Sequence, residues 1–122
     1  MRWKQLVLIS ALAAGCTQAV RPATPEGRWT LVAVDGAALP ANVGAQIRVE
    51  SGTLELNADG TYSELTESSA GPGALRAQFA GRWRWSGGTV ELLDREAGLP
   101  FVARWAGSSL EVTGERAMRY AR

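Results

Sequence analysis

The chain has 122 residues and a formal net charge of +1, from 13 basic and 12 acidic side chains, and this length supports a single domain. The balance is not basic enough to indicate a nucleic-acid partner. Histidine is absent and Cys16 is the single cysteine, which excludes histidine-based catalysis, an internal disulfide and a cysteine-rich zinc site. We therefore expect a protein that is not an enzyme and that uses neither a metal nor another cofactor.

The first sixteen residues have the layout of a secretory signal peptide that ends at a cysteine. Arg2 and Lys4 precede the mostly apolar run 6–15, which is too short to span a bilayer. Small residues lead directly to Cys16, and this arrangement resembles the lipobox of bacterial lipoproteins, in which that cysteine is lipidated. The commonest lipobox has Leu three positions before the cysteine, where this chain has Ala13. The alternative is an ordinary signal peptide with a cysteine that falls by chance at its end.

We interpret residues 1–15 as the signal peptide, 16–26 as the lipidated cysteine with a polar, proline-containing tether, and 27–122 as the folded domain. Acyl chains on Cys16 and on the new amino terminus would hold the protein firmly on a membrane. Thr17, rather than Asp, follows the cysteine. By resemblance to well-studied lipoproteins, this residue indicates the periplasmic face of the outer membrane.

From Arg28 onwards, apolar and polar residues alternate in the manner of half-buried β-strands. Pairs such as Asp59-Gly60 are typical of tight hairpins, and no segment shows convincing helical periodicity. The predicted strands are 28–34, 46–50, 53–57, 61–67, 78–86, 89–93, 100–105, 109–113 and 117–121. About nine short strands joined mainly by hairpins predict an all-β fold, either a small antiparallel up-and-down barrel or a strongly curved meander sheet.

Two segments interrupt this meander. The sequence of residues 37–45 is compatible with a loop or with one helical turn. Residues 68–74 are small, rich in glycine and interrupted by Pro72, so we expect a mobile loop there. Such a loop would be either a lid at the mouth of a barrel or a slack connection between unequal strands.

The tripeptide 27–29, Gly-Arg-Trp, opens the first predicted strand and resembles the G-x-W element of lipocalins and related calycins. The order and spacing of WTLVAVDGAALP, SGTLELNADGTYSE, GRWRWSGGTVELL and the final RYAR are similar to small bacterial lipocalin-like lipoproteins over residues 27–122. This resemblance implies that Trp29 closes the narrow end of a barrel beneath an arginine of the last strand. Arg119 and Arg122 are the candidates for that cation–π contact. Compared with full lipocalins, the chain is far shorter and lacks their long C-terminal helix.

Alternation also places large aromatic side chains on the predicted inner face of the barrel. An eight-stranded barrel is just wide enough to fill itself with side chains or to enclose one small ligand. These aromatic residues therefore either form the core or line a pocket for an apolar molecule. The predicted inward set comprises Trp29, Met118 and the candidate pocket residues Phe79, Trp83, Trp85, Phe101, Trp105 and Tyr120.

The charged residues of the predicted strands have simpler interpretations. Arg82 and Arg84 alternate with tryptophans, and we expect them on a solvated outer face. Glu64 and Glu67 are three positions apart, so their carboxylates are expected on opposite faces of a strand and not as a catalytic pair.

Two functions are compatible with these features. The first is a membrane-anchored, periplasm-facing lipoprotein whose barrel binds a hydrophobic small molecule or lipid. The second is a non-catalytic interaction module, a filled barrel that presents loops to an envelope protein, as small periplasmic protease inhibitors resembling lipocalins do. Neither involves nucleic acid, and a resemblance in fold does not choose between them.

Overall fold

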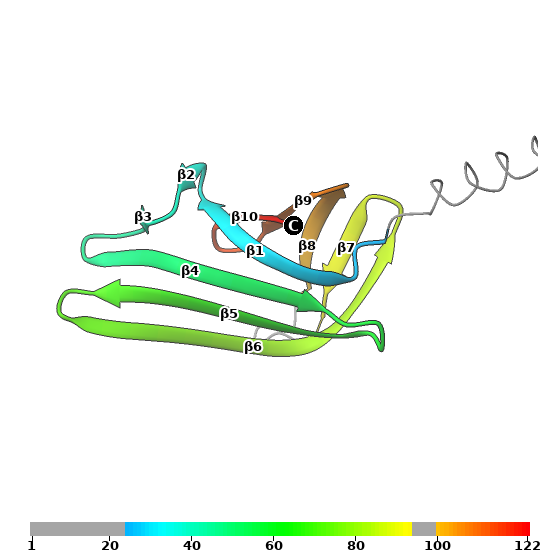
Figure 1. Ribbon diagram of the computed structural model, residues 1–122, viewed down its shortest axis with the longest axis horizontal. Coiled ribbons are helices and arrows are strands. Elements are labelled where there is room, and N and C mark those ends of the chain that lie inside the picture. Colours follow the sequence, from blue (N-terminus) through cyan, green and yellow to red (C-terminus); the bar gives the residue numbers. More distant parts are fainter. Residues whose placement is uncertain (1–23, 94–99) are drawn as a thin grey trace, which may run out of the picture.

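The computed structural model describes residues 24–93 and 100–122 and is built from antiparallel strands (Figure 1). The predicted signal peptide, Cys16 and the tether up to residue 23 lie outside the described residues. The strands, in chain order, are β1 (Gly27–Val34), β2 (Ala37–Ala38), β3 (Ala41–Asn42), β4 (Ile47–Leu56), β5 (Thr61–Ala70), β6 (Gly73–Ser86), β7 (Thr89–Leu92), β8 (Phe101–Ala106), β9 (Ser109–Thr113) and β10 (Ala117–Ala121).

Eight of these strands close into a barrel. Each strand from β4 to β10 pairs with the next one along the chain, and β1 pairs with β10 on one side and with β4 on the other. The closing register sets Gly27 opposite Leu56 and Thr30 opposite Thr53. This topology confirms the prediction of an antiparallel up-and-down barrel and rules out an open curved sheet, because β1 bonds to both of its neighbours.

The hairpin formed by β5 and β6 extends past the other strands, together with β4, at the left of Figure 1. The prediction of a mobile loop over 68–74 is wrong, because the ladder continues out to the pair Ala70 and Gly73. The chain reverses at Gly71 and Pro72, and Gly71 has a φ of 59°. Glycine accepts the positive φ that the first central residue of a type II′ hairpin turn requires, and the fixed negative φ of proline is compatible with the second.

Two further segments differ from expectation. Residues 37–45 contain the two-residue strands β2 and β3, which pair with β1 and β4, so they form neither a helical turn nor a simple loop. The predicted strands 46–50 and 53–57 are one strand, β4, with a register shift between Val49 and Ser51. The bulge at this shift bends the strand without ending it, which explains why the sequence resembles two strands.

Alternate residues of the strands bury their side chains inside the barrel, as the period of two predicts. Complete or nearly complete burial of each large apolar side chain stabilises the fold by roughly 1.5–3 kcal/mol relative to its exposure. The large side chains of this core are Trp29, Leu31, Val34, Val49, Leu54, Leu56, Tyr62, Val90, Leu92, Leu110, Val112 and Tyr120.

Candidate functional site

One end of the barrel is closed by Trp29, whose side chain is fully buried at the start of β1. The guanidinium carbon of Arg122 lies 4.3 Å from the centroid of the Trp29 ring. Of the two arginines proposed for this position, Arg122 therefore makes the contact. Arg119 instead is exposed and lies opposite Glu111 on the neighbouring strand, so it does not close the barrel.

The segment that precedes β1 lies across this closed end. The indole Nε1 of Trp29 donates a hydrogen bond to the carbonyl of Pro25 at 2.9 Å, and Pro25 is buried. Arg122 donates to the carbonyls of Glu26 at 2.8 Å and of Thr24 at 2.6 Å. Thr24, Pro25 and Glu26, which the sequence analysis assigned to the tether, therefore contact the closed end of the barrel.

Three of the candidate pocket residues are tryptophans near this same end, and they do not line one interior pocket. Trp83 and Trp105 donate their indole N–H groups to the turn carbonyls of Asn57 at 2.8 Å and Gly107 at 3.1 Å. The ring of Trp85 meets that of Trp105 edge to face, with centroids 5.4 Å apart. Trp85 is 44% exposed, which corrects its predicted place in the interior. Alternation specifies which face a residue takes but not how far along the barrel it lies.

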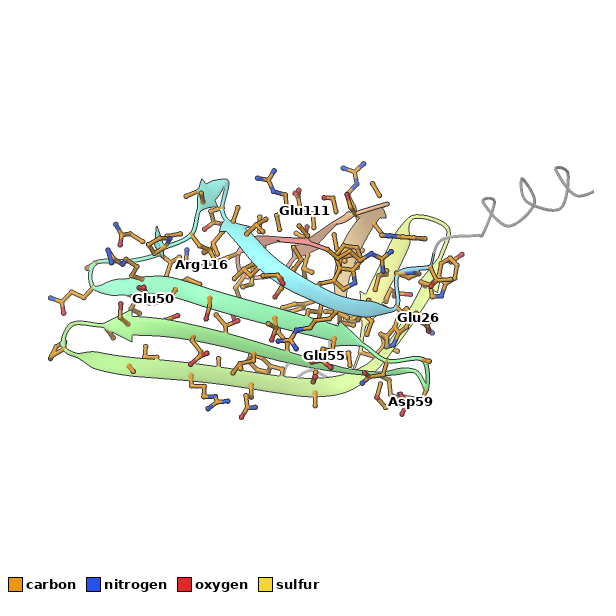
Figure 2. All side chains as sticks on the ribbon, viewed as in Figure 1. Glu26, Glu50, Glu55, Asp59, Glu111 and Arg116 are labelled. Atoms are coloured by element: carbon orange, nitrogen blue, oxygen red, sulfur yellow. The ribbon has the colours of Figure 1, made fainter. Side chains whose placement is uncertain are left out.

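The opposite end of the barrel contains a cavity of about 320 Å³, here called the barrel cavity. Figure 2 shows Arg116 and Glu50 at this end, and Glu26 and Asp59 at the closed end. Of the six candidate pocket residues, Phe79 and Phe101 line the barrel cavity, as does the predicted inward residue Met118. The complete lining is Val34, Val43, Val49, Glu64, Thr66, Ala77, Phe79, Phe101, Val112, Glu115, Arg116 and Met118.

Glu64 is the buried charged residue of this lining, with 5% of its surface exposed. The hydroxyl of Tyr120, itself fully buried, donates a hydrogen bond of 3.0 Å to Glu64 Oε2. Glu64 lies two residues after the buried Tyr62 on β5, whereas Glu67 is exposed, so the two carboxylates do lie on opposite faces. Sequence reasoning placed this pair correctly but missed that Glu64 faces inward. Glu64 lies two positions from the apolar Tyr62, so the alternation of the strand could have indicated that both side chains face inward.

Arg116 fixes the rim of the barrel cavity by joining three segments. Its Nη1 lies 3.1 Å from Asp35 Oδ2, after β1, and its Nη2 donates to the carbonyl of Val43, after β3, at 2.5 Å. The backbone N–H of Ala117 donates to the other carboxylate oxygen of Asp35 at 2.9 Å. This backbone hydrogen bond, reinforced by Arg116, lowers the pKa of Asp35 below its ordinary value.

Beyond the rim, the projecting hairpin carries apolar side chains in phase with the cavity lining. Leu75 lies two positions before Ala77 on β6, on the same face as Ala77 and Phe79, and is 49% exposed. Ile47 lies two positions before Val49 on β4, on the same face, and is 40% exposed. We call Ile47 and Leu75 the apolar lip, because they continue the cavity wall outward.

No family model, curated protein or solved structure matches the chain. Within residues 24–93 and 100–122, no helix is long and apolar enough to cross a membrane. The same residues do not gather three His, Cys, Asp or Glu side chains into a group that could hold a metal ion.

Proposed function

We propose that this protein is a small binding barrel for an apolar or amphipathic molecule, carried on a lipoprotein of the bacterial envelope. The observation that carries the proposal is the barrel cavity, whose 320 Å³ lies at the lower end of the roughly 300–1,000 Å³ typical of small-molecule sites. Its walls are mainly apolar, with the rings of Phe79 and Phe101 and the thioether of Met118 among them. A mainly apolar wall with a few polar groups is the composition expected of such a site.

We also propose a lipocalin-like relationship. It is supported by the up-and-down barrel, by the Gly-Arg-Trp opening of β1 and by the cation–π contact between Arg122 and Trp29. These features support a similarity in fold, and a similarity in fold does not identify the ligand.

In this proposal Cys16 carries the lipid, and the tether reaches the barrel at its closed end. Thr24 lies eight positions after Cys16, so the connecting chain spans at most about 29 Å. Because Arg122 binds Thr24 and Glu26 across the closed end, the anchor holds that end toward the membrane. The barrel cavity then opens away from the outer membrane, toward the periplasm.

The second candidate function, a module that binds an envelope protein, is favoured by the apolar lip. Leu75 and Ile47 are 49% and 40% exposed on strands that project beyond the barrel. Exposed apolar side chains that gather on a projecting element can mark a contact surface for another protein. Loss of a partner on substitution of the apolar lip, with small-molecule binding intact, would support this second function.

The experiment uses the chain from residue 17, which omits the predicted signal peptide and Cys16 and keeps all of residues 24–122. A neutral fluorescent probe, N-phenyl-1-naphthylamine, is titrated into this protein and into two variants of β6. Ala77→Trp places an indole in the barrel cavity, whereas Ala80→Trp adds the same side chain on the outer face of the strand. We expect Ala77→Trp to lose probe binding and Ala80→Trp to keep it.

Equal binding by the two variants would contradict the proposed site. Native mass spectrometry of the unsubstituted protein, purified gently from a periplasm, provides a second readout. A bound mass that disappears on denaturation, and that Ala77→Trp does not carry, would identify the ligand.

A further inference from the structure

The strand β6 extends well past its neighbour β7, on the side where β4, β5 and β6 project from the barrel (Figure 1). It pairs with β5 over residues 73–82, whereas the described ladder with β7 covers only residues 83–86. Residues 73–78 are all exposed, including Leu75 and Ala77 on the face that continues into the cavity wall. A strand of a closed barrel normally buries that face. Its exposure here shows that this part of β6 has no described neighbour beyond β5.

Successive residues of a strand direct their backbone N–H and C=O groups to opposite edges. On β6, the carbonyl of Arg82 accepts a hydrogen bond of 2.7 Å from the N–H of Leu93, on the β7 side. The N–H of Trp83 donates at 2.9 Å to the carbonyl of Gly60, on the β5 side. The ladder with β5 has no register shift, so this alternation continues to the hairpin turn. The residues of the projecting part that direct their backbone groups away from β5, here called the β6 edge, are Ala74, Arg76 and Gln78.

The connection between β7 and β8 is too short to cover the outer part of the β6 edge. Leu92 and Phe101 lie opposite each other and are joined by eight residues. A connection of that length extends at most about 16 Å past Leu92. Leu92 lies opposite Trp83, and Arg76 lies about 23 Å along β6 from Trp83. The backbone groups of Ala74 and Arg76 are therefore accessible to a partner.

An open edge of this kind binds other strands unless the protein blocks it. The usual blocks are proline, charged side chains and bulges. Residues 73–86 contain no proline, and the ladder between β5 and β6 has no bulge. Arg76 is the charged residue of the open part. In strand addition, main-chain hydrogen bonds supply affinity and alternate side chains supply selectivity.

The side chains beside the β6 edge define the chemistry of a strand that would fit it. Leu75 is 49% exposed on the cavity side, so apolar side chains on that face of the added strand would cover it. On the outer face, Arg76 lies opposite Glu67 of β5. A carboxylate on the other side of Arg76 continues this alternation of charge, whereas a cation there is unfavourable.

A second copy of this chain fits the β6 edge less well than a different protein does. Two copies related by a two-fold axis near Arg76 would pair antiparallel, so their closed ends would point in opposite directions. Trp85 lies near the closed end, nine positions after Arg76, which separates the two closed ends by about 60 Å. The proposed tether spans at most about 29 Å, so one membrane could not anchor both copies.

We infer that the β6 edge binds an extended segment of another envelope protein, which adds a strand beside β6 with apolar side chains toward Leu75 and a carboxylate toward Arg76. This inference rests on the second candidate function, the module that binds an envelope protein, and on the proposed lipid anchor. It adds the mode of binding, which is backbone pairing at the β6 edge, and the chemistry of the partner segment.

The test uses the chain from residue 17 and the peptide acetyl-TVEVTVT-amide, in which valines alternate with polar residues. Exchange of backbone amide hydrogens is followed by NMR with and without the peptide. We expect exchange at Ala74 and Arg76 to slow by about tenfold or more, because their N–H groups become hydrogen-bonded. The N–H of Leu75 already faces β5 and should change much less. Replacing the glutamate of the peptide by lysine should weaken binding by roughly threefold or more.

Two substitutions of one residue separate the backbone from the side chain. Arg76→Pro removes an N–H of the β6 edge and leaves the hydrogen bonds to β5 in place. We expect it to lose peptide binding and to keep binding of N-phenyl-1-naphthylamine. Arg76→Ala is the matched control, which should bind the peptide but no longer prefer glutamate over lysine. If Arg76→Pro does not fold, Ala74→Pro removes the neighbouring N–H of the β6 edge and gives the same test.

The outcomes separate strand addition from the functions proposed above. Full peptide binding by the proline variants would overturn pairing at the β6 edge. If they bind the peptide and Leu75→Ser does not, the apolar lip is the contact surface, and the second candidate function stands without strand addition. A dimer in analytical ultracentrifugation that Arg76→Pro dissociates would make a second copy the occupant and overturn the inference. A protein that binds N-phenyl-1-naphthylamine but not the peptide would overturn the inference and leave the barrel cavity as a binding site.

Discussion

The guanidinium of Arg122 lies 4.3 Å above the buried ring of Trp29, and the same group donates hydrogen bonds to the carbonyls of Glu26 and Thr24. One side chain after β10 thus joins the end of the meander to its beginning. The contact closes the barrel at the end opposite the barrel cavity, whose lining includes Arg116.

Arg122→Ala should therefore reduce the free energy of unfolding by about 1–3 kcal/mol, from the lost cation–π contact and the lost charge-assisted hydrogen bonds. Urea denaturation followed by tryptophan fluorescence measures this loss. Arg119→Ala removes the other arginine of β10, which is exposed, and should change stability by less than about 0.5 kcal/mol. Equal losses in the two variants would show that the contact with Trp29 contributes little.

The ion pair of Asp35 with Arg116 predicts a dependence of stability on pH. The backbone N–H of Ala117 and the guanidinium of Arg116 lower the pKa of Asp35 in the folded state. The unfolded chain therefore binds a proton at Asp35 more readily, so its contribution is present above the ordinary pKa of 3.8 and is lost as pH falls through the folded value. We expect Asp35→Asn to be less stable than the unsubstituted protein at neutral pH and to approach it in acid.

Thermal unfolding of both proteins between about pH 7 and pH 2 tests this prediction, because only the difference between them reports on Asp35. Other carboxylates titrate over the same range and cancel in that difference. If the difference in thermal stability between the two proteins stays constant down to the lowest pH, the effect of Asp35→Asn comes from the geometry of the turn and not from the charge of Asp35.

Alternation in the sequence predicted an antiparallel meander and left a barrel and a curved sheet open, because strands such as β1, β4 and β9 alternate exposed and buried side chains. It was insufficient at the bulge between Val49 and Ser51, where one extra residue made β4 resemble two strands. Nearby, a Cβ on Gly52 would lie 2.8 Å from Leu31, so this glycine permits the close approach of β1. The turn at Gly71 was misjudged because small residues were taken as a sign of mobility, although Gly-Pro also suits a tight hairpin.

The candidate site was predicted only in part, for two physical reasons. Trp85 and Phe101 were both predicted to face inward, but their positions along the barrel differ, so Phe101 lines the barrel cavity while the exposed Trp85 lies near the closed end. Glu64 was considered only as a catalytic partner of Glu67 and was set aside, because the two carboxylates were expected on opposite faces of the strand. Its phase with the buried Tyr62 indicated an inward side chain, whereas its hydrogen-bond partner Tyr120 lies 56 positions away in the sequence, where no local pattern reveals it.

The last prediction concerns Cys16, which lies outside the described residues. If it carries the lipid, cells that express the full chain and are fed an alkyne-labelled fatty acid should incorporate the label into this protein. Cys16→Ser should incorporate none and should move to the soluble fraction, because two or more acyl chains are what hold such a protein on a membrane. Thr17→Asp keeps the cysteine, and should keep the label while shifting the protein from the outer to the inner membrane. Label on Cys16→Ser, or its continued full association with the membrane, would show that the anchor is elsewhere.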